Sequence, residues 1–472
     1  MKSERRWDVL VVGGGASGTL LVAQLLRSAS SPLRVALLEK EARVGPGLAY
    51  ATSTPSHLLN VPVGRMSAFP EDPEHFLRWM RRVEPATAPG DFVPRMRYGQ
   101  YLESLLRECR RNASPGVVLE SIRGEAVDIS QEGDTVRVTL AEGLVLEARR
   151  VVLALGNARP ADLPVEEGGL FSSPQYVRSP WERGALDDIE PHHSVLLVGT
   201  GLTMVDTALS LAERNHEGRI HALSRHGLLP QVHREGVQPI PPPDFPAPRS
   251  LRGVFRALRR HIESQPAGTD WRGVVDGLRP LTASLWGGLS VPSRRRFLRH
   301  ARALWDTHRH RMAPSVAETL TQLRRAGVLH VHAGRLRGFQ LQEEGWVEVR
   351  ARPRGVVFEA TLRVQHVINC TGPDCSMVRG HPLLCALLES GLARLDALGI
   401  GLATDEEGGL LDAGGRTSSL LSTLGPLRRG SLWESTAIPE IRAQAAVLAR
   451  RLRLELASHQ GLFDAGDVHP LV

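Results

Sequence analysis

Near its N-terminus the chain reads Val9-Leu10-Val11-Val12-Gly13-Gly14-Gly15-Ala16-Ser17-Gly18 and continues as a helix-like segment over residues 19–26. The β-branched run predicts a buried strand, and the glycines predict a tight turn into a helix. Gly13 permits the turn, Gly15 lets the backbone approach a pyrophosphate, and Gly18 lets the helix pack closely on the strand. The helix N-terminus then points its free N–H groups and its positive dipole end toward the phosphates.

An acidic residue follows at the expected distance. A second strand-like segment, residues 34–38, ends at Glu39, which lies 21 residues after Gly18. A carboxylate at that position accepts hydrogen bonds from an adenosine ribose. The glycines alone are weak evidence, but the strand, the helix and the acid together predict a dinucleotide-binding domain of the α/β class.

The same pattern returns at residues 195–211, where an apolar strand is followed by Gly199-Thr200-Gly201 and a helix. The next strand ends in Ser224-Arg225-His226-Gly227, without an acid. An arginine there suits a 2′-phosphate, which a carboxylate would repel, so this loop favours NADPH over NADH. The alternative, that Arg225 is simply solvent-exposed, stays open.

Two further segments resemble each other. Residues 149–157 and 364–373 each form an apolar strand that stops at a glycine, Gly156 and Gly372 respectively. Alternating stretches precede them, at residues 120–130 and 135–140 in the first case and at 329–341 and 346–351 in the second. We interpret each set as a small antiparallel layer leading into a strand. The duplication predicts two related Rossmann-like domains, one interrupting the other.

Composition narrows the function classes. The 472 residues suggest at least two domains, and 42% hydrophobic residues are typical of a globular protein. We find no apolar run long enough to cross a membrane and no secretory signal, so a cytoplasmic location is expected. The net charge of +7 is carried by arginine, since lysine occurs only at positions 2 and 40. Without a nucleic-acid-binding motif, we attribute this bias to genome composition and expect no nucleic-acid partner.

Sulfur chemistry and ketone oxygenation are disfavoured. Cys370 and Cys375 are spaced C-x4-C but follow the last strand, not either glycine loop, and we expect Cys370 to be a small buried residue. The segment Phe171 to Trp181 lacks the glycine and histidine of the Baeyer–Villiger fingerprint.

Several motifs carry a family resemblance that spans nearly the whole chain. They are GPGLAY at 45–50, HLLNVPVGRMS at 57–67, SRHGLLP at 224–230, NCTGP at 369–373 and WESTAIPEIR at 433–442. The chain resembles the flavoproteins with two dinucleotide-binding domains, most closely a bacterial family described as FAD/NAD(P)-binding protein. It is more distantly similar to class B flavin monooxygenases, including the amine N-hydroxylases, which share a segment like residues 94–102.

The resemblance implies that Gly13, Gly15, Gly18 and Glu39 hold the adenosine diphosphate of FAD. It also implies that Asn60 and Met66 lie near the flavin ring, Val127 near the adenine and Gly372 near the pyrophosphate. The helix starting near Ile438 would point its N-terminus at the flavin pyrimidine, where reduced flavin is negative. The full candidate cofactor-binding set is Gly13, Gly15, Ala16, Ser17, Gly18, Glu39, Lys40, Asn60, Met66, Arg95, Val127, Gly156, Gly199, Gly201, Ser224, Arg225, Gly372 and Ile438. We assign no catalytic residue and no metal ligand.

The predicted domains are an FAD domain formed by residues 1–165 and 365–472, an NADPH domain formed by 190–238 and 325–364, and a helical insertion at 239–324. The insertion begins with a proline-rich stretch, Pro239 to Pro248, interpreted as a stiff linker.

Two segments, residues 305–314 and the pair Trp433–Glu434, each have two interpretations. Within residues 305–314, His308 and Arg311 would share one helix face, and part of this segment could line a substrate cavity and attract an acidic group. We favour the other interpretation, a solvated helical face. Trp433 and Glu434 could equally form a packing corner or a flavin-side contact.

The functional expectation is an FAD monooxygenase that uses NADPH and O₂, forms a flavin C4a-(hydro)peroxide and oxygenates a small-molecule nucleophile. The substrate would be an amine or an acidic molecule, with amine N-hydroxylation the preferred example. One alternative is an NAD(P)H-dependent reductase or dehydrogenase without oxygen insertion. Another is a non-catalytic FAD or nucleotide sensor, which the second glycine loop disfavours because such a protein needs no coenzyme site.

Overall fold

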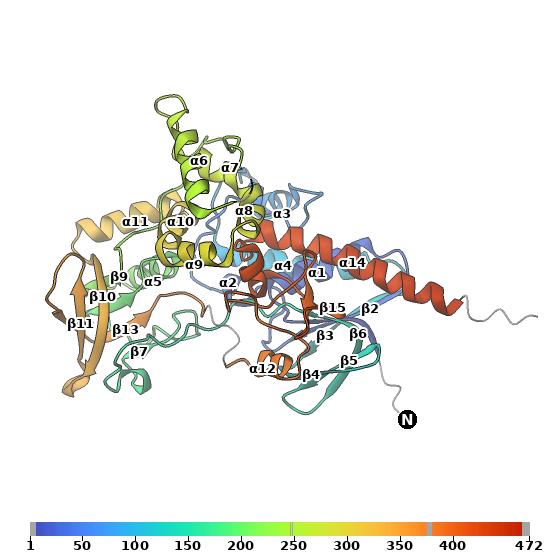
Figure 1. Cartoon of the computed structure of the whole chain (residues 1–472). Helices are drawn as coiled ribbons and strands as arrows, with labels where there is room; N and C mark the ends of the chain where they lie inside the picture. The colour runs from blue at the N-terminus through green and yellow to red at the C-terminus, as the bar shows by residue number, and fades with distance from the viewer. Residues whose placement is uncertain (1–5, 246, 248, 375–379, 465–472) are drawn as a thin grey trace, which may run out of the picture.

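The computed structural model describes residues 6–245, 247, 249–374 and 380–464. The chain forms two sheets that lie side by side, with a group of helices above the boundary between them (Figure 1). Pro246, Pro248 and Cys375, which entered the sequence predictions, lie outside the described residues. No helix in the described ranges is both long and apolar enough to cross a membrane.

The first sheet is built around the strand that precedes Gly13. Five parallel strands run in the order β3 (Val117–Arg123), β2 (Leu33–Glu39), β1 (Trp7–Val12), β6 (Val145–Leu153) and β15 (Thr417–Thr423). The strand β14 (Gly409–Leu411) pairs antiparallel with β15, and β4 (Ala126–Glu132) and β5 (Thr135–Leu140) form an antiparallel layer next to β6. Because both faces of the central strands are covered, their residues read as continuous apolar runs.

Three helices cover one face of this sheet: α1 (Ala16–Ser28), α4 (Arg95–Arg111) and α14 (Ile438–Asp464). Smaller elements beside them are α2 (Gly47–Tyr50), a 3-10 turn at Val63–Arg65 and α3 (His75–Val83). The opposite face packs on the antiparallel layer, on α12 (Pro382–Glu389) and on a 3-10 turn at Gly425–Arg428. The N-terminal and C-terminal parts of the chain therefore share one core.

The second sheet repeats the first. Its parallel strands run in the order β10 (Leu329–Leu341), β9 (Ile220–Ser224), β8 (Val195–Val198), β13 (His366–Asn369) and β7 (Tyr176–Val177). The antiparallel strands β11 (Val347–Pro353) and β12 (Ala360–Val364) extend it beyond β10. The helices α5 (Leu202–Glu213) and α11 (Pro314–Arg325) cover one face, and a 3-10 turn at Leu170–Ser172 packs near the other. This repetition confirms the predicted fold of two Rossmann-like domains.

Three expectations about strand placement are corrected. The sequence predicts an antiparallel stretch over residues 120–130, but β3 pairs parallel with β2 and the chain turns at Gly124 before β4 begins. The predicted boundary at residue 365 falls too early, because β13 pairs with β8 in the second sheet. That sheet also takes in β7, which precedes the predicted start at residue 190. An edge strand of two residues carries too little pattern to be recognised in a sequence.

The helical insertion consists of α6 (Leu251–Glu263), α7 (Trp271–Leu278), α8 (Thr282–Gly287), α9 (Val291–His300) and α10 (Arg302–Arg309), with a 3-10 turn at Arg279–Leu281. It docks on the first domain through an aromatic cluster. Trp433, which follows α13 (Arg429–Leu432), lies 5.0 Å from Trp286 and 5.3 Å from Phe297 between ring centroids. Glu434 accepts a hydrogen bond from the Trp305 indole at 3.0 Å. These contacts support the packing-corner interpretation of Trp433 and Glu434.

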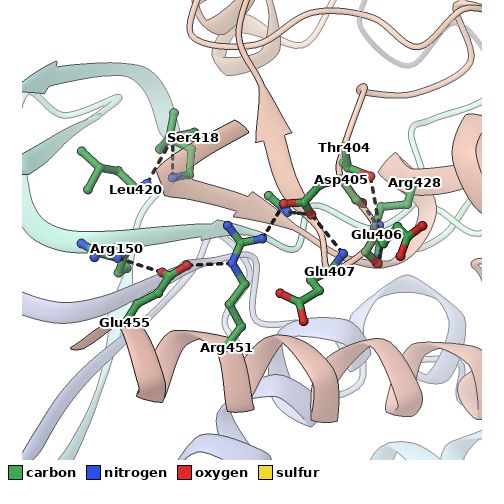
Figure 2. Close-up of polar contacts among 12 residues, drawn as sticks. Arg150, Thr404, Asp405, Glu406, Glu407, Ser418, Leu420, Arg428, Arg451 and Glu455 are labelled. Atoms are coloured by element: carbon green, nitrogen blue, oxygen red, sulfur yellow. Dashed lines mark hydrogen bonds and ion pairs between the residues drawn. The ribbon is translucent and has the colours of Figure 1, made fainter. Parts of the chain in front are cut away.

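A polar network fixes α14 to the sheet it covers (Figure 2). Arg150, on β6, is 2% exposed and pairs with Glu455 at 3.2 Å. Arg451, one helical turn earlier, pairs with Glu455 and with Asp405, each at 2.7 Å. The middle of α14 is therefore held in a fixed position relative to the strands.

Candidate functional site

The first glycine loop has the geometry that its sequence predicts. Gly13 has φ +105°, and a Cβ there would lie 2.4 Å from the Ala154 carbonyl oxygen. A Cβ on Gly18 would lie 2.0 Å from the Gly13 carbonyl oxygen. A side chain at Gly13 would clash with the backbone that follows β6, and one at Gly18 would push α1 away from the end of β1, so both glycines are required for the close packing of this loop.

The N-terminus of α1 is open to an anion. Gly15 is its N-cap, no side chain caps the helix, and no acidic residue lies in the first turn. Glu39 stands beside it at the end of β2, where its carboxylate accepts hydrogen bonds from Gly14 N at 2.7 Å and Glu41 N at 3.0 Å. A carboxylate has about four acceptor positions, which leaves capacity for a ribose hydroxyl.

A second segment covers this loop. Gly45 N donates to Gly14 O at 2.7 Å, and a Cβ on Gly15 would lie 3.4 Å from Gly47 Cα. Gly45 and Gly47 have φ +120° and +53°. In the sequence, the GPGLAY motif of this turn carries only a family resemblance. Its two closely spaced glycines are the signal that this turn approaches another backbone closely.

The expected flavin-side residues come together between the first sheet and α14. Met66 and Ile438 are both 2% exposed and belong to the same core. Arg442, one turn into α14, donates to Ser67 O at 3.0 Å. Asn60 O accepts from His233 Nε2 at 3.0 Å, so the 60–67 segment also contacts the chain beyond β9.

The C-terminal segment contributes a buried polar group at the same place. A Cβ on Gly425 would lie 2.8 Å from Ser17 Oγ and 3.9 Å from Ser435 O. The Ser435 hydroxyl is buried, the residue being 0% exposed, and has no hydrogen-bond partner among the described residues. An unpartnered hydroxyl beside the open end of α1 fits a site for a polar cofactor such as FAD.

The second glycine loop repeats the first closely. Gly199 has φ +115°, and its Cβ would lie 2.4 Å from the Cys370 carbonyl oxygen. Gly201 caps α5 with φ −83° and ψ −168°, close to the −70° and −166° of Gly15. No side chain caps α5 and its first turn has no acid. Met204 takes the third glycine's place and is fully buried.

The end of β9 is positively charged. Ser224 Oγ lies 2.8 Å from Thr200 Oγ1 and accepts from Gly227 N at 3.0 Å, which closes the turn. Arg225 is exposed. Partial burial lowers the pKa of His226, and Arg354, Arg225 and Arg335 lower it further. Three arginines thus surround the position where a 2′-phosphate is expected.

Other predicted residues take places that the sequence did not specify. Lys40 pairs with Glu125 at 3.2 Å on the surface. Val127 lies at a bulge in β4. Gly156 and Gly372 follow the equivalent strands β6 and β13, have φ +70° and +85°, and have no atom within 4 Å of an added Cβ. Both could therefore approach a ligand.

Arg95 connects the two domains. Its guanidinium pairs with Asp206 on α5 at 2.9 Å, and both side chains are largely buried. His57 Nε2 lies 2.8 Å from Ser210 Oγ and 3.0 Å from Asp206 O. Burial lowers the pKa of His57 and raises that of Asp206, although Arg95 opposes the rise. Sequence reasoning missed this bridge because its members come from segments more than 100 residues apart.

A cavity of about 450 Å³ lies beside the start of α14. Its charged lining residues are Arg65, Asp276, Arg279 and Arg442, and its walls include Pro239–Pro242, Gly277, Pro280 and Pro439. Arg279 makes a two-point ion pair with Glu440, at 2.6 and 2.8 Å. The stretch predicted as a linker is therefore a wall of this cavity.

The favoured interpretation of residues 305–314 as a solvated face is wrong. Arg309 is 8% exposed and pairs with Glu434 at 3.6 Å and Glu440 at 3.4 Å. Arg311 is 3% exposed and pairs with Asp276. His308 is half-buried and contacts Trp271 edge-on. The carboxylates that pair with these buried arginines come from distant segments, which the local sequence pattern could not reveal.

Cys370 is the small buried residue expected. It is 3% exposed, and burial raises the pKa of its thiol to about 12. A thiol with that pKa is not a nucleophile near neutral pH.

The comparisons with known proteins agree with this geometry. Residues 10–158 match the family model described as FAD-NAD(P)-binding. The solved structure of the ornithine N-hydroxylase of Kutzneria sp. 744 has a TM-score of 0.66 at 16% identity and covers 95% of this chain and 99% of that one. The chain has the two-domain flavoprotein fold. L-lysine 6-monooxygenase from Pseudomonas syringae shows the same flavoprotein fold, with a TM-score of 0.66, 16% identity, and coverage of 95% of this chain and 100% of that one.

One curated relative has a detectable sequence similarity. Nitrosuccinic acid synthase of Aspergillus oryzae is 25% identical over 297 residues, which are 58% of this chain and 43% of that protein. The chain thus spans less than half the length of this relative. Within the flavoprotein fold, the roles of single residues toward FAD and NADPH stay predictions.

Proposed function

We propose that this protein is an FAD-dependent monooxygenase that uses NADPH and O₂ to oxygenate the nitrogen of a small amine. The observation that carries the proposal is the duplication of the phosphate-binding loop, in which a Cβ added to Gly13 or to Gly199 would lie 2.4 Å from a carbonyl oxygen, that of Ala154 or of Cys370. Two such loops suit two dinucleotides, one for FAD and one for the coenzyme that reduces it. A sensor of a single nucleotide has no use for the second loop.

Oxygen insertion is favoured over electron transfer alone by the comparisons. The two amine hydroxylases match with TM-scores of 0.66, whereas thioredoxin reductase from Lactococcus lactis matches with 0.53. Nitrosuccinic acid synthase is named for a nitrogen-oxygenated dicarboxylic acid. The high pKa of Cys370 also argues against disulfide exchange.

In the proposed reaction, an amine, O₂, NADPH and a proton give a hydroxylamine, water and NADP⁺. Bound FAD would supply the electron transfer between NADPH and O₂. The chain's own residues would position the reactants. Gly15 and Glu39 would hold the FAD adenosine diphosphate, the α14 N-terminus would face the flavin pyrimidine, and Gly201 with Arg225 would hold NADPH. A cytoplasmic location and the absence of a nucleic-acid partner stay predictions.

The test is to reduce the purified flavoprotein anaerobically with NADPH or NADH and then admit oxygenated buffer with a candidate amine. The proposal expects faster reduction by NADPH and a hydroxylamine product that matches the NADPH consumed. Transfer of the electrons to an added quinone, with no oxygenated product from any amine, would instead establish the reductase alternative.

Replacing Arg225 by glutamine tests the coenzyme preference. Removing one charge from the 2′-phosphate position should raise KM for NADPH roughly tenfold, as expected for one lost charge-assisted hydrogen bond. KM for NADH should stay unchanged because NADH lacks that phosphate. Arg337→Gln, a partly exposed arginine of the same sheet that pairs with Glu359, is the matched control. Equal effects on the two coenzymes would show that Arg225 does not contact the 2′-phosphate.

A further inference from the structure

The cavity beside α14 has an unbalanced positive charge. Of its four charged lining residues, Asp276 is paired with Arg311 and Arg279 is paired with Glu440. Within the described residues, neither Arg65 nor Arg442 forms an ion pair with a carboxylate; Arg442 donates to the Ser67 carbonyl oxygen instead. Among the described residues, two guanidinium groups therefore face the cavity without an ion-pair partner.

The surroundings carry the same sign. Burial lowers the pKa of Arg442, and the nearby Arg279 lowers it further, while Tyr98 and Glu440 oppose the shift. His233, whose imidazole contacts Asn60 O, has its pKa lowered to about 4 by burial, with Arg311 and Arg65 adding to the effect. Positive charge in and around the cavity repels cations and favours anions.

The cavity wall opposite α14 is rigid. Ile240 N donates to Gly273 O at 2.9 Å. A Cβ on Gly277 would lie 1.8 Å from Ile240 O, and one on Gly273 would lie 2.6 Å from Gln238 O. The prolines on either side of Ile240 restrict the backbone further. The shape of the cavity is therefore set before a ligand binds, which lowers the entropy cost of binding.

The cavity also lies next to the predicted position of the flavin ring. Arg65 directly precedes Met66 and is next to the predicted flavin segment, while Pro439 and Arg442 belong to the first turns of α14. A small molecule held there would be adjacent to the predicted position of the flavin ring.

We propose that this cavity takes an amino dicarboxylate, whose two carboxylates pair with Arg65 and Arg442. The proposal rests on the function proposed above, because the amine of the same molecule would be the nitrogen that is oxygenated. Guanidinium groups bind carboxylates through paired N–H donors, and two unbalanced arginines match two carboxylates. A diamine or a basic amino acid would instead bring further positive charge to a positive cavity.

Binding is tested on the FAD-loaded protein by calorimetric titration with L-aspartate, with succinate as an amine-free probe, and with cadaverine as a dication. The proposal expects L-aspartate and succinate to bind and cadaverine not to bind. Arg65→Gln and Arg442→Gln should each weaken succinate binding roughly 10-fold to 100-fold, in line with the loss of a charge-assisted pair. Arg416→Gln removes the same charge from an exposed site and should leave binding unchanged.

A second variant distinguishes a loss of binding from a loss of folding. Arg442 contacts the chain through Ser67, but Arg65 is exposed, so Arg65→Glu should fold normally and shift the preference from succinate toward cadaverine. Tight binding of cadaverine by the unchanged protein, or succinate binding that neither arginine affects, would overturn the proposal.

The two proposals can fail separately. Succinate binding through both arginines without oxygenation of L-aspartate would leave the cavity's ligand class in place and remove the monooxygenase function. Oxygenation of cadaverine without succinate binding would keep the monooxygenase function and remove the proposed ligand class of the cavity.

Discussion

At the scale of single residues, the glycines divide into those required for packing and those that face open space. Added side chains at Gly13, Gly18 and Gly199 would meet backbone oxygens at 2.0–2.4 Å. Gly201 has no atom within 4 Å of an added Cβ and has a negative φ. Its lack of a side chain is therefore not required by the fold and points to a ligand.

Replacing Gly201 by alanine should leave folding intact and weaken coenzyme binding. The new methyl group would occupy the space through which a pyrophosphate approaches α5, so we expect KM for NADPH to rise about tenfold or more. FAD content and Tm should match those of the unchanged protein. Gly90→Ala, at a turn that is equally open, is the control for the change of residue type. An unchanged KM would show that the coenzyme does not approach this loop.

The Arg95–Asp206 pair should hold the domains together. Asp206→Ala leaves a largely buried guanidinium unpaired, and we expect a loss of about 3 kcal/mol in the free energy of unfolding. Arg95→Met combined with Asp206→Leu should recover most of it, since neither charge is then buried alone. Urea unfolding measures the free energy of unfolding of the single variant and of the double variant. Glu132→Ala, which removes a surface partner of Arg137, should cost less than about 1 kcal/mol. A similar loss of stability from Asp206→Ala and from Glu132→Ala would mean that the interdomain pair contributes no more than a surface contact.

At the scale of elements, neighbouring strands of the second sheet bring histidines together. His221 on β9 lies 3.1 Å from His332 on β10, Nδ1 to Nε2, and 5.5 Å from His330 between ring centroids. Burial lowers the pKa of His221 to about 4, and His332, His330 and Arg219 add to the shift. The three neighbouring side chains that shift the pKa of His221 all carry positive charge when protonated.

Acid should therefore weaken the second domain. The unfolded chain binds protons at His221 below about pH 6.5, whereas the folded chain resists until about pH 4. Stability from this group is present above pH 6.5 and is lost as the pH falls toward 4. His221→Gln should flatten the fall of Tm over that window, and His300→Gln, at an exposed histidine of α9, should not. Equal slopes for all three proteins would show that His221 titrates normally when folded.

Local patterns predicted the central elements and failed where the pairing is remote. The glycine loops, Glu39 at the end of β2 and the strands β5, β10 and β11 were identified because each depends on neighbours in the sequence. The burial of Arg309 and Arg311 depends on Glu434 and Asp276, which no local pattern connects to them. The cavity was missed for the same reason, since its lining comes from four separate segments.

At the scale of the whole molecule, the expected FAD site is assembled from distant parts of the chain. The first glycine loop, the turn at Gly45, the 60–67 segment and the start of α14 meet on one side of the first sheet. The second domain and the insertion contact this site from outside, through His233 and Arg279. A ligand there would add further contacts between segments that are otherwise joined by side-chain packing and a few hydrogen bonds.

Removing FAD should therefore loosen one domain more than the other. A ligand at a hundred times its Kd stabilises the state that binds it by about 2.7 kcal/mol. In the FAD-free protein we expect faster amide exchange in residues 13–18, 45–67 and 425–444, and little change in residues 195–224. Hydrogen-exchange mass spectrometry measures both regions in one experiment. A uniform increase across the two sheets would contradict the placement of FAD in the first domain.

The pairing of β15 with β6, Leu421 beside Val151, has a consequence for the protein's synthesis. More than 260 residues separate the end of β6 from the start of β15, and every strand of the second sheet is made within that interval. At about 5–20 residues per second, a ribosome needs roughly 13–50 s to deliver the missing strand. Throughout that time the edge of β6 that pairs with β15 has no partner, whereas the second sheet is complete once β13 is made, before β15. The order of translation thus makes the inserted domain the first to mature and leaves the enclosing one dependent on the last part of the chain.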